Sequence, residues 1–428
     1  MSNKAKTSLV PKLRFPEFHG AGEWIKEKLG SLASISTEKV GNEICVPMSI
    51  TSGVGLVSQE DKFGRVIAGS SYKNYFLLKP NDFAYNKSAT KEYPEGFLAL
   101  YSGDKLAAVP NSIFTCFRIK GDSPNPQYLN YLFLGNLHGQ WLRNFIQVGA
   151  RAHGSLSIND SDLLALPVPL PKGQSSLAEQ QKIAICLSSL DELIAAQAGK
   201  VDALKTHKKV LMQQLFPREG ENQPRRRFPE FQNAGAWEET RLGKMGVLVS
   251  GLTYSPDDVR ESGLLVLRSS NVQQGEIALD DCVYVDPLIK GANLSQPNDI
   301  LICVRNGSKA LIGKCARVPD GMPLCTHGAF MTVFRAKAPS FVFQLFQSDR
   351  YQKQVAGDLG ATINSINGGQ LLKYEFFVPK PAEQQRIADC LNSLDDLITS
   401  QTQELETLKT HKKGLMQQLF PSAEAVEA

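Results

Sequence analysis

The sequence predicts a mixed α/β chain in which two globular domains are separated by a long antiparallel two-helix coiled-coil spacer, as a pseudo-two-fold repeat. The segment LKTHKKVLMQQLFP at 204–217 returns with a single change at 408–421, and RFPEF at 14–18 returns at 227–231. The stretches between these anchors differ in sequence. Because a close repeat sets the architecture of a chain, we expect the repeated parts to have the same function and the differing parts to have different functions.

Composition places few limits on function. The chain has 428 residues, of which 42% are hydrophobic and 21% charged, which is enough for two or three domains with their own cores. The net charge of +4 permits a nucleic-acid partner without requiring one. We expect no membrane association, because no apolar run approaches the ~20 residues of a membrane span and the first residues lack a signal-peptide core. The 8 cysteines are scattered without a C-x-x-C pair, so we expect reduced thiols and a cytoplasmic location.

The repeated segments predict where each part begins and ends. The expected parts are a first domain over 1–174, a first helix over 175–217, a linker over 218–226, a second domain over 227–379, a second helix over 380–421 and a tail over 422–428.

Both predicted helices carry a seam of residues spaced alternately by four and three, from Ile183 to Leu215 and from Ile387 to Leu419. Sustained spacing of this kind is typical of a coiled coil, and the Gln and Lys at matching seam positions restrict the register. Ser176 and Glu179 form a capping-box pattern before the first helix. The seam residues expected to form the spacer and to bind partner subunits are Leu187, Leu190, Ile194, Leu204, Leu211, Leu391, Leu394, Ile398, Leu408 and Leu415. In the alternative interpretation, each helix is amphipathic and lies only on the core of its own domain.

The order of the parts predicts the direction of the helices. The second opening motif follows soon after Pro217, so the second domain starts near the far end of the first helix. Because that domain is compact, the second helix should begin near the same end of the first helix. The second helix should therefore run back along the first.

The two domains read as mixed α/β modules. Their strand-like runs are YFLLKPNDFAY (75–85), SIFTCFRIK (112–120), GLLVLRSSNV (263–272), DILICVRN (299–306) and AFMTVFRAK (329–337). Each domain also has a polar, glycine-containing crossing, at 147–162 and at 358–370.

Motifs that would indicate catalysis are incomplete. NPQY at 125–128 departs from the Asn-Pro-Pro-Tyr loop of amino-methyltransferases, and Pro126 suits the first residue of a helix. GSKALIGKC at 307–315 has the wrong spacing for a phosphate loop, and Cys315 stands where Ser or Thr would bind magnesium. The sequence contains no nucleophile triad, metal-ligand spacing or nuclease carboxylate cluster. The chain is therefore expected to be non-catalytic.

The chain resembles the DNA-specificity subunit of a type I restriction–modification enzyme. The resemblance rests on WIKEKLG (24–30) and WEETRLG (237–243), on AEQQKIA and AEQQRIA after proline-rich strands, and on LMQQLFP at the end of each helix. It implies two target-recognition domains that each read half of an interrupted, asymmetric sequence in double-stranded DNA. The repeated helices would form the spacer and bind two modification subunits, and two restriction subunits would join them. No cofactor is expected on this chain, because S-adenosylmethionine, Mg and ATP belong to the partner subunits.

Polar loops after apolar strands are the candidate DNA contacts, because Arg, Lys, Asn and Ser read base edges or bind phosphates. The candidates are Lys87, Ser88, Lys91, Arg151, His153, Arg268, Asn271, Arg305, Asn306, Lys309, Thr362 and Asn364. Any single one can equally be a solvated loop residue. Two other functions stay open, namely a stand-alone DNA methyltransferase or nuclease, and a coiled-coil scaffold with no DNA role.

Overall fold

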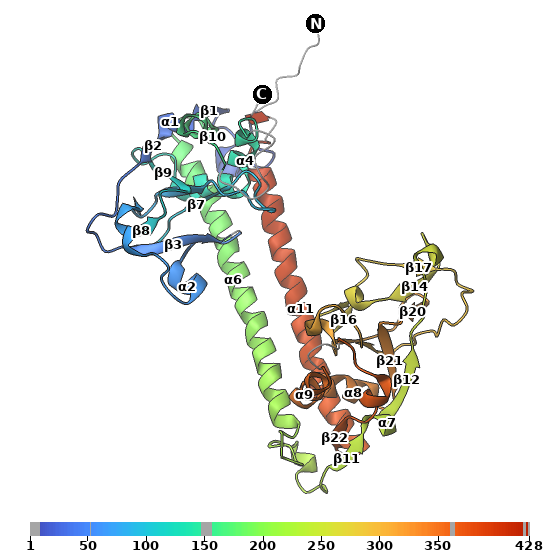
Figure 1. The fold of residues 1–428 in the computed structure, drawn as a ribbon. Coiled ribbons are helices and arrows are strands. Elements are labelled where there is room, and N and C mark those ends of the chain that lie inside the picture. Colours follow the sequence, from blue (N-terminus) through green and yellow to red (C-terminus); the bar gives the residue numbers. More distant parts are fainter. Residues whose placement is uncertain (1–8, 52, 147–155, 360–363, 423–424, 427–428) are drawn as a thin grey trace. The chain divides into compact units, whose positions relative to one another are not determined.

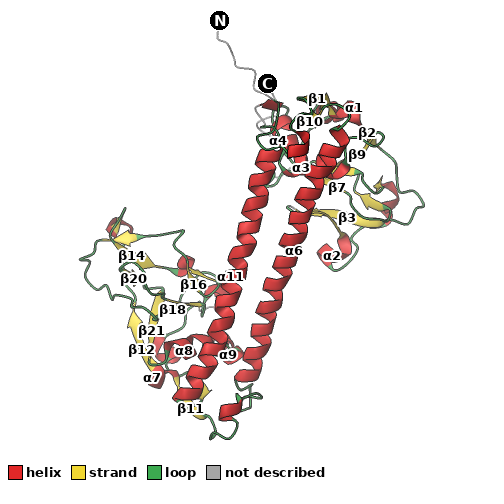
Figure 2. Cartoon of the chain, turned by 180° about the vertical axis from the view of Figure 1, so that it is seen from behind, coloured by secondary structure: helices red, strands yellow, loops and turns green. Residues whose placement is uncertain are grey.

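The computed structural model describes residues 9–51, 53–146, 156–359, 364–422 and 425–426. The chain divides into two compact units, which we call unit 1 (Met1–Gln197 with Glu404–Ala428) and unit 2 (Ala198–Gln403). Each unit contains one body, half of the long helix α6 (Ser176–Leu215) and half of the long helix α11 (Pro381–Leu419) (Figures 1 and 2). The predicted mixture of helices and strands is confirmed.

Unit 1 is built on two four-stranded sheets, with strand orders β2-β9-β6-β7 and β4-β3-β8-β5. Its strands are β1 (Trp24–Lys28), β2 (Ala33–Ser36), β3 (Val46–Thr51), β4 (Gly55–Ser58), β5 (Phe76–Leu78), β6 (Phe83–Asn86), β7 (Phe97–Leu100), β8 (Ala107–Val109), β9 (Phe114–Ile119) and β10 (Pro167–Pro171). Its shorter helices are α1 (Leu29–Leu32), α2 (Gln59–Phe63), α3 (Pro126–Leu134), α4 (Leu137–Leu142) and α5 (Asp160–Leu164).

Unit 2 also contains two four-stranded sheets, with orders β12-β21-β18-β19 and β13-β17-β14-β20. Its strands are β11 (Glu238–Arg241), β12 (Gly246–Ser250), β13 (Val259–Arg260), β14 (Leu264–Leu267), β15 (Val272–Gln273), β16 (Glu276–Ile277), β17 (Tyr284–Val285), β18 (Ile300–Cys303), β19 (Cys315–Arg317), β20 (Cys325–His327), β21 (Met331–Ala336) and β22 (Glu375–Val378). Its shorter helices are α7 (Leu242–Met245), α8 (Pro339–Leu345), α9 (Asp349–Asp358) and α10 (Gly368–Leu371).

The pairing of strands is alike in the two units. The antiparallel sheets β2-β9-β6-β7 and β12-β21-β18-β19 have corresponding orders along the chain. In the second sheet of each unit, one pair is parallel, β3 with β8 in unit 1 and β14 with β20 in unit 2. The strands that open and close each body, β1 with β10 and β11 with β22, pair antiparallel. Two bodies that differ in sequence therefore share the order of the first sheet and one parallel strand pair, while the edge strands of the second sheet differ, with β5 beside β8 in unit 1 and β13 beside β17 in unit 2.

An ion pair between a partly exposed arginine and a buried aspartate stands at the same place in both antiparallel sheets. Arg118 on β9 donates two hydrogen bonds of 2.7 Å to the carboxylate of Asp82, which is fully buried. Arg335 on β21 donates bonds of 2.9 and 2.8 Å to Asp299, which is 2% exposed. Each carboxylate raises the pKa of its arginine. The sequence signals are the tripeptides Pro-Asn-Asp at 80–82 and 297–299 and the Phe-Arg dipeptides on β9 and β21, so the bodies are less different than their sequences suggested.

A second repeated ion pair ties the opening motif to the first turn of each long helix. Arg14 donates two bonds of 2.7 Å to Glu179, and Arg227 donates bonds of 2.8 and 2.6 Å to Glu383. Both glutamates are at most 2% exposed. The capping box expected of Ser176 with Glu179 is corrected here, because the Glu179 carboxylate binds Arg14 and the Ser176 hydroxyl donates to the carbonyl of Pro171. In each unit, the repeated RFPEF motif and the repeated AEQQ motif are therefore joined to each other by this ion pair.

Within each unit, one half of α6 lies beside one half of α11 and runs in the opposite direction. In unit 1, Lys412 donates to Asp191, and Gln197 donates to Glu404 at 3.3 Å. In unit 2, the Lys208 ammonium donates to both carboxylate oxygens of Asp395 at 2.6 and 2.7 Å. The lysines of the predicted seam thus pair with acids on the opposite helix.

The hydrophobic cores combine each body with these helix halves. In unit 1, Ile183, Ala184 and Leu187 of α6 join the core that holds Phe83 and Phe117. In unit 2, Ile387, Ala388 and Leu391 of α11 pack with residues such as Phe334 and Phe376. Within the described residues, none of the helices combines the length and the apolarity that crossing a membrane requires.

Candidate nucleic-acid interface

In unit 2, three strand ends bring polar loops together at one edge of the sheets. Strands β14 and β20 are parallel, so the segments that follow them start side by side, and the Gly328 amide donates to the Leu267 carbonyl at 3.0 Å. Arg268 follows β14 directly. The loop after β18 joins the same place, because the amides of Val304 and Arg305 donate to the carbonyl of Phe330.

Side-chain hydrogen bonds then fasten these loops to one another. The Asn306 amide nitrogen donates to the hydroxyl of Ser269 at 3.0 Å, and its oxygen accepts from the Ser308 amide at 2.9 Å. The Asn364 amide nitrogen donates to the carbonyl of Gly307 at 3.1 Å. The structure therefore gathers three of the predicted loops of unit 2 into one cluster, which we call the unit 2 loop cluster (Arg268–Ser269, Val304–Lys309, Phe330 and Asn364–Ser365).

Arg305 and Lys309 of this cluster are exposed. Arg268 is half-buried and forms an ion pair of 2.7 Å with Asp281. Asn271 has a different position from the one expected. Its side chain is fully buried, accepts from the Arg268 amide and donates to the carbonyls of Ala278 and Asp281. Direct contact of Asn271 with a base is corrected to a structural role, because its amide group is used to shape the loop.

In unit 1, the corresponding loop follows β6. The Lys87 carbonyl accepts from the amide of Leu156 at 2.6 Å, and the Lys87 amide donates to the carbonyl of Ile113 at 2.9 Å. The backbone amide of Ser88 donates a hydrogen bond to the side-chain oxygen of Asn86, and Lys91 is exposed. The loop after β6 therefore meets the end of the polar crossing, as the loop after β18 does in unit 2. The candidates Arg151, His153 and Thr362 lie outside the described residues.

The seam residues of the long helices face inward. All those predicted as spacer or partner contacts are buried or half-buried, and none of them is exposed: Leu187, Leu190, Ile194, Leu204, Leu211, Leu391, Leu394, Ile398, Leu408 and Leu415. A residue that packs inside its own unit has little surface left for a partner. The outer surface instead carries Leu193, which is 54% exposed, and Leu397, which occupies the same position of the repeat and is 42% exposed. Both leucines fall outside the predicted seam, and each directly follows an acidic residue, Glu192 in one copy and Asp396 in the other.

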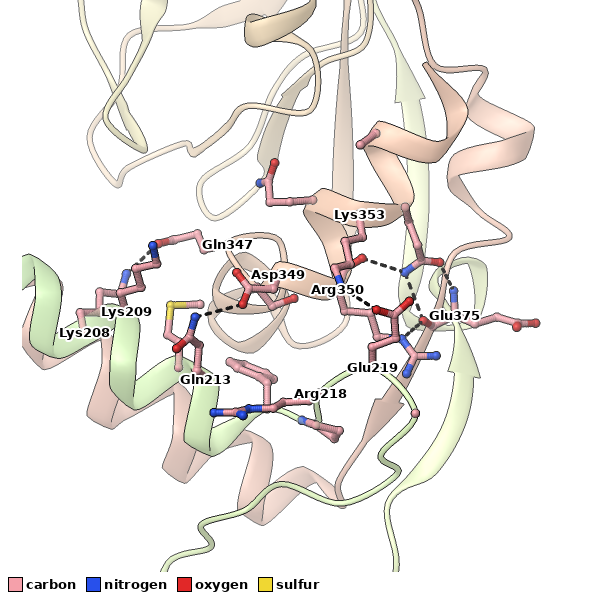
Figure 3. A pocket seen from close by; sticks show the side chains of 18 of the residues that line it. Lys208, Lys209, Gln213, Arg218, Glu219, Gln347, Asp349, Arg350, Lys353 and Glu375 are labelled. Carbon is pink, nitrogen blue, oxygen red and sulfur yellow. Dashed lines mark hydrogen bonds and ion pairs between the residues drawn. The ribbon is translucent and has the colours of Figure 1, made fainter. Parts of the chain in front are cut away.

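A cleft of about 1330 Å³ lies in unit 2 between α6, the segment after it and α9 (Figure 3). Its side chains pair with one another, namely Lys208 with Gln347, Gln213 with Asp349 and Lys353 with Glu219. The residues that line it come from α6, the segment after it, the turn before α9, α9 itself and Glu375 of β22, and not from the unit 2 loop cluster.

Two titratable side chains, Cys315 and His138, are buried in a way that favours their neutral forms. Burial raises the pKa of the Cys315 thiol to about 12 and lowers the pKa of His138 to about 4. Such shifts disfavour the thiolate and the imidazolium near neutral pH. In the part of the chain that the structure describes, no group of three or more His, Cys, Asp or Glu side chains is placed to hold a metal ion.

The chain is similar to known proteins of a single kind. Residues 235–410 match the sequence profile of the type I restriction modification DNA specificity domain. The StySPI specificity subunit of Salmonella potsdam and the EcoKI specificity subunit of Escherichia coli are each 27% identical over 197 residues, which is 44% of this chain. These matches span 42% of the length of either relative. The MjaVIII specificity subunit of Methanocaldococcus jannaschii is 25% identical over 288 residues, which cover 65% of this chain and 66% of that protein.

A solved structure has the same fold. The S subunit of the type I restriction–modification system from M. genitalium superposes with a TM-score of 0.59 at 16% identity, covering 96% of this chain and 99% of that one. The motifs that open and close each body, the matching profile and these relatives agree. The chain is thus similar to type I restriction enzyme specificity subunits, and its residues 235–410 match their DNA specificity domain.

Proposed function

We propose that this chain is the non-catalytic DNA-reading subunit of a type I restriction–modification complex and that it recognises a bipartite, asymmetric site in double-stranded DNA. One observation carries the proposal: the first antiparallel sheets of the two units have corresponding strand orders, and the corresponding strands β6 and β18 lead into different polar loops. A constant scaffold with two different loops suits two readers of two different half-sites. The target-recognition domains correspond to the two bodies, and a cytoplasmic location belongs to the same proposal.

The chemistry of the loops suits base and phosphate contacts. Arg305 is exposed at a strand end, and a guanidinium can donate two bonds to the O6 and N7 atoms of guanine. Lys309 and Lys91 are exposed cations that suit phosphate contacts. Asn306 and Ser88 hold the loops in shape through their own hydrogen bonds. Arg305 is therefore the first choice for a base-reading residue in unit 2.

The repeated helices would act as the spacer and as the docking surface for partner subunits. We take α6 and α11 as the antiparallel coiled-coil spacer of a pseudo-two-fold subunit, which the lysine–acid pairs in each unit support. Two modification subunits would dock on these helices, with two restriction subunits joining them, and S-adenosylmethionine, Mg and ATP would be bound by those partners. A partner that attaches twice in one way needs two like surfaces, and Leu193 and Leu397 supply them.

DNA reading is tested with the assembled complex. Arg305→Ala should relax the methylated sequence in one half of the site, and Lys87→Ala with Lys91→Ala should affect only the other half. Sequencing that detects methylated bases reports both halves at once. Sequence changes in the same half from both sets of variants would contradict the two-reader proposal. If the isolated chain bound S-adenosylmethionine in calorimetry, a stand-alone methyltransferase would be the better interpretation. If the DNA affinity of the complex did not fall steeply with salt concentration, a coiled-coil scaffold would be the better interpretation of this chain.

Docking is tested at the exposed leucines. Leu193→Asp and Leu397→Asp should each remove one modification subunit, and the double variant should remove both, as measured by native mass spectrometry. Ile185→Asp is the matched control, because Ile185 is 64% exposed but the other helix already carries Asp389 at that position. Full assembly of the double variant would show that the partners dock elsewhere.

A further inference from the structure

An aromatic side chain lies exposed in the middle of the unit 2 loop cluster. Phe330 is 58% exposed, although it directly precedes the buried residues of β21. Its carbonyl accepts the amides of Val304 and Arg305, both at 3.1 Å. The guanidinium carbon of Arg305 lies 5.7 Å from the centre of the phenyl ring. The ring therefore lies beside the exposed guanidinium of Arg305.

Exposure alone would carry no argument, because single apolar residues are common on protein surfaces. In the same unit Leu288 is 89% exposed and Leu324 is 61% exposed, but they stand after β17 and before β20. Phe330 differs by its surroundings, since the segments after β14, β18 and β20 all meet around it. A phenyl ring has no N–H or O–H to donate to the polar groups of these loops. Its exposed position among them therefore indicates contact with an apolar group of a ligand.

We propose that Phe330 is a specificity-determining residue that contacts the C5-methyl group of a thymine in the half-site read by unit 2. The inference rests on the proposed function. Thymine is the base that presents a methyl group in the major groove, next to acceptors that arginine and lysine can bind. Arg305 would bind an adjacent guanine or phosphate while the neighbouring ring covers the methyl group. One loop cluster would then read a polar and an apolar feature side by side.

Unit 1 has an apolar residue at the matching position. Ile113 directly precedes β9, as Phe330 precedes β21, and its carbonyl accepts the amide of Lys87. Ile113 is half-buried, so it presents less apolar surface than Phe330 does. The two units thus share the backbone position and differ in the reach of the side chain, which is what two different half-sites require.

The test uses the assembled complex and duplexes in which each thymine of the recognised sequence is replaced in turn by deoxyuridine. Loss of one buried methyl group corresponds to about 0.8 kcal/mol, or an affinity about fourfold lower. The wild-type complex should lose about fourfold at one thymine of the unit 2 half-site. The Phe330→Ala complex should bind the thymine and uracil duplexes equally at that position, with an unchanged dependence of affinity on salt. Leu288→Ala is the control and should keep the wild-type pattern.

Several outcomes would overturn the inference. The first is that the Phe330→Ala complex still distinguishes thymine from uracil at the same position as the wild type. The second is that Phe330→Ala lowers the affinity for the thymine duplex and for the uracil duplex by the same factor. The third is that the unit 2 half-site contains no thymine. In each case, sequence-specific binding by the wild-type complex would leave the proposed function intact. A wild-type complex that bound all sequences equally would instead contradict the proposed function itself.

Discussion

The ion pair between Arg227 and Glu383 should contribute strongly to the stability of unit 2. The two side chains are 12% and 2% exposed and share two short hydrogen bonds, of 2.8 and 2.6 Å. Glu383→Gln removes the charge and leaves the Arg227 guanidinium buried without a counter-charge. Removing one partner of a buried pair costs about 3–5 kcal/mol. For a unit of this size that corresponds to a fall of about 6–20 °C in the Tm of unit 2.

Calorimetric unfolding of the full chain measures this effect. Glu375→Gln is the matched control in the same unit, because its partner Arg241 is 64% exposed and such a pair contributes at most about 1 kcal/mol. Replacing both Arg227 and Glu383 with Met should restore most of the loss, since no buried charge is then left alone. A Glu383→Gln transition as high as that of Glu375→Gln would refute the reasoning.

Three further predictions concern other parts of the chain. His138 is buried with a pKa of about 4, below its ordinary value of 6.5, so the unfolded chain binds a proton before the folded one does. Stability should therefore fall by about 2 kcal/mol between pH 7.5 and 5, and denaturant titrations of His138→Phe should lack that part of the fall. Lys208→Met should cost about 1–3 kcal/mol in the same titrations, because Asp395 and Gln347 lose a buried partner. Inserting seven residues after Ala198 and after Thr402 keeps the seam in register and should lengthen the preferred gap by at most about three base pairs, without changing the bases read. An unchanged gap in the methylated motif would contradict the spacer role.

The sequence was most informative where physical constraints repeat. The four-and-three spacing predicted two long helices, which the structure places over Ser176–Leu215 and Pro381–Leu419. Periodicity could also indicate that the seam faces inward, but it could not show that Leu193 and Leu397, which lie outside the seam, are exposed. Asn271 was misjudged for a related reason. An asparagine after a strand suits both a base contact and a loop-shaping role, and only the position of the Ala278 and Asp281 carbonyls decides between them.

The repeated ion pairs and the variable loops lie at opposite ends of the same strands. Asp82 directly precedes β6 and Asp299 directly precedes β18, whereas Lys87 and Val304 directly follow these strands. The arginine–aspartate pairs therefore fasten the sheet at one end, and the polar loops leave it at the other. A change in a loop should leave the ion pair and the strand pairing in place, so the fold of the sheet should not depend on the sequence of the loop. This separation gives a physical reason why one order of strands in the first sheet can carry two different loop sets within a single chain.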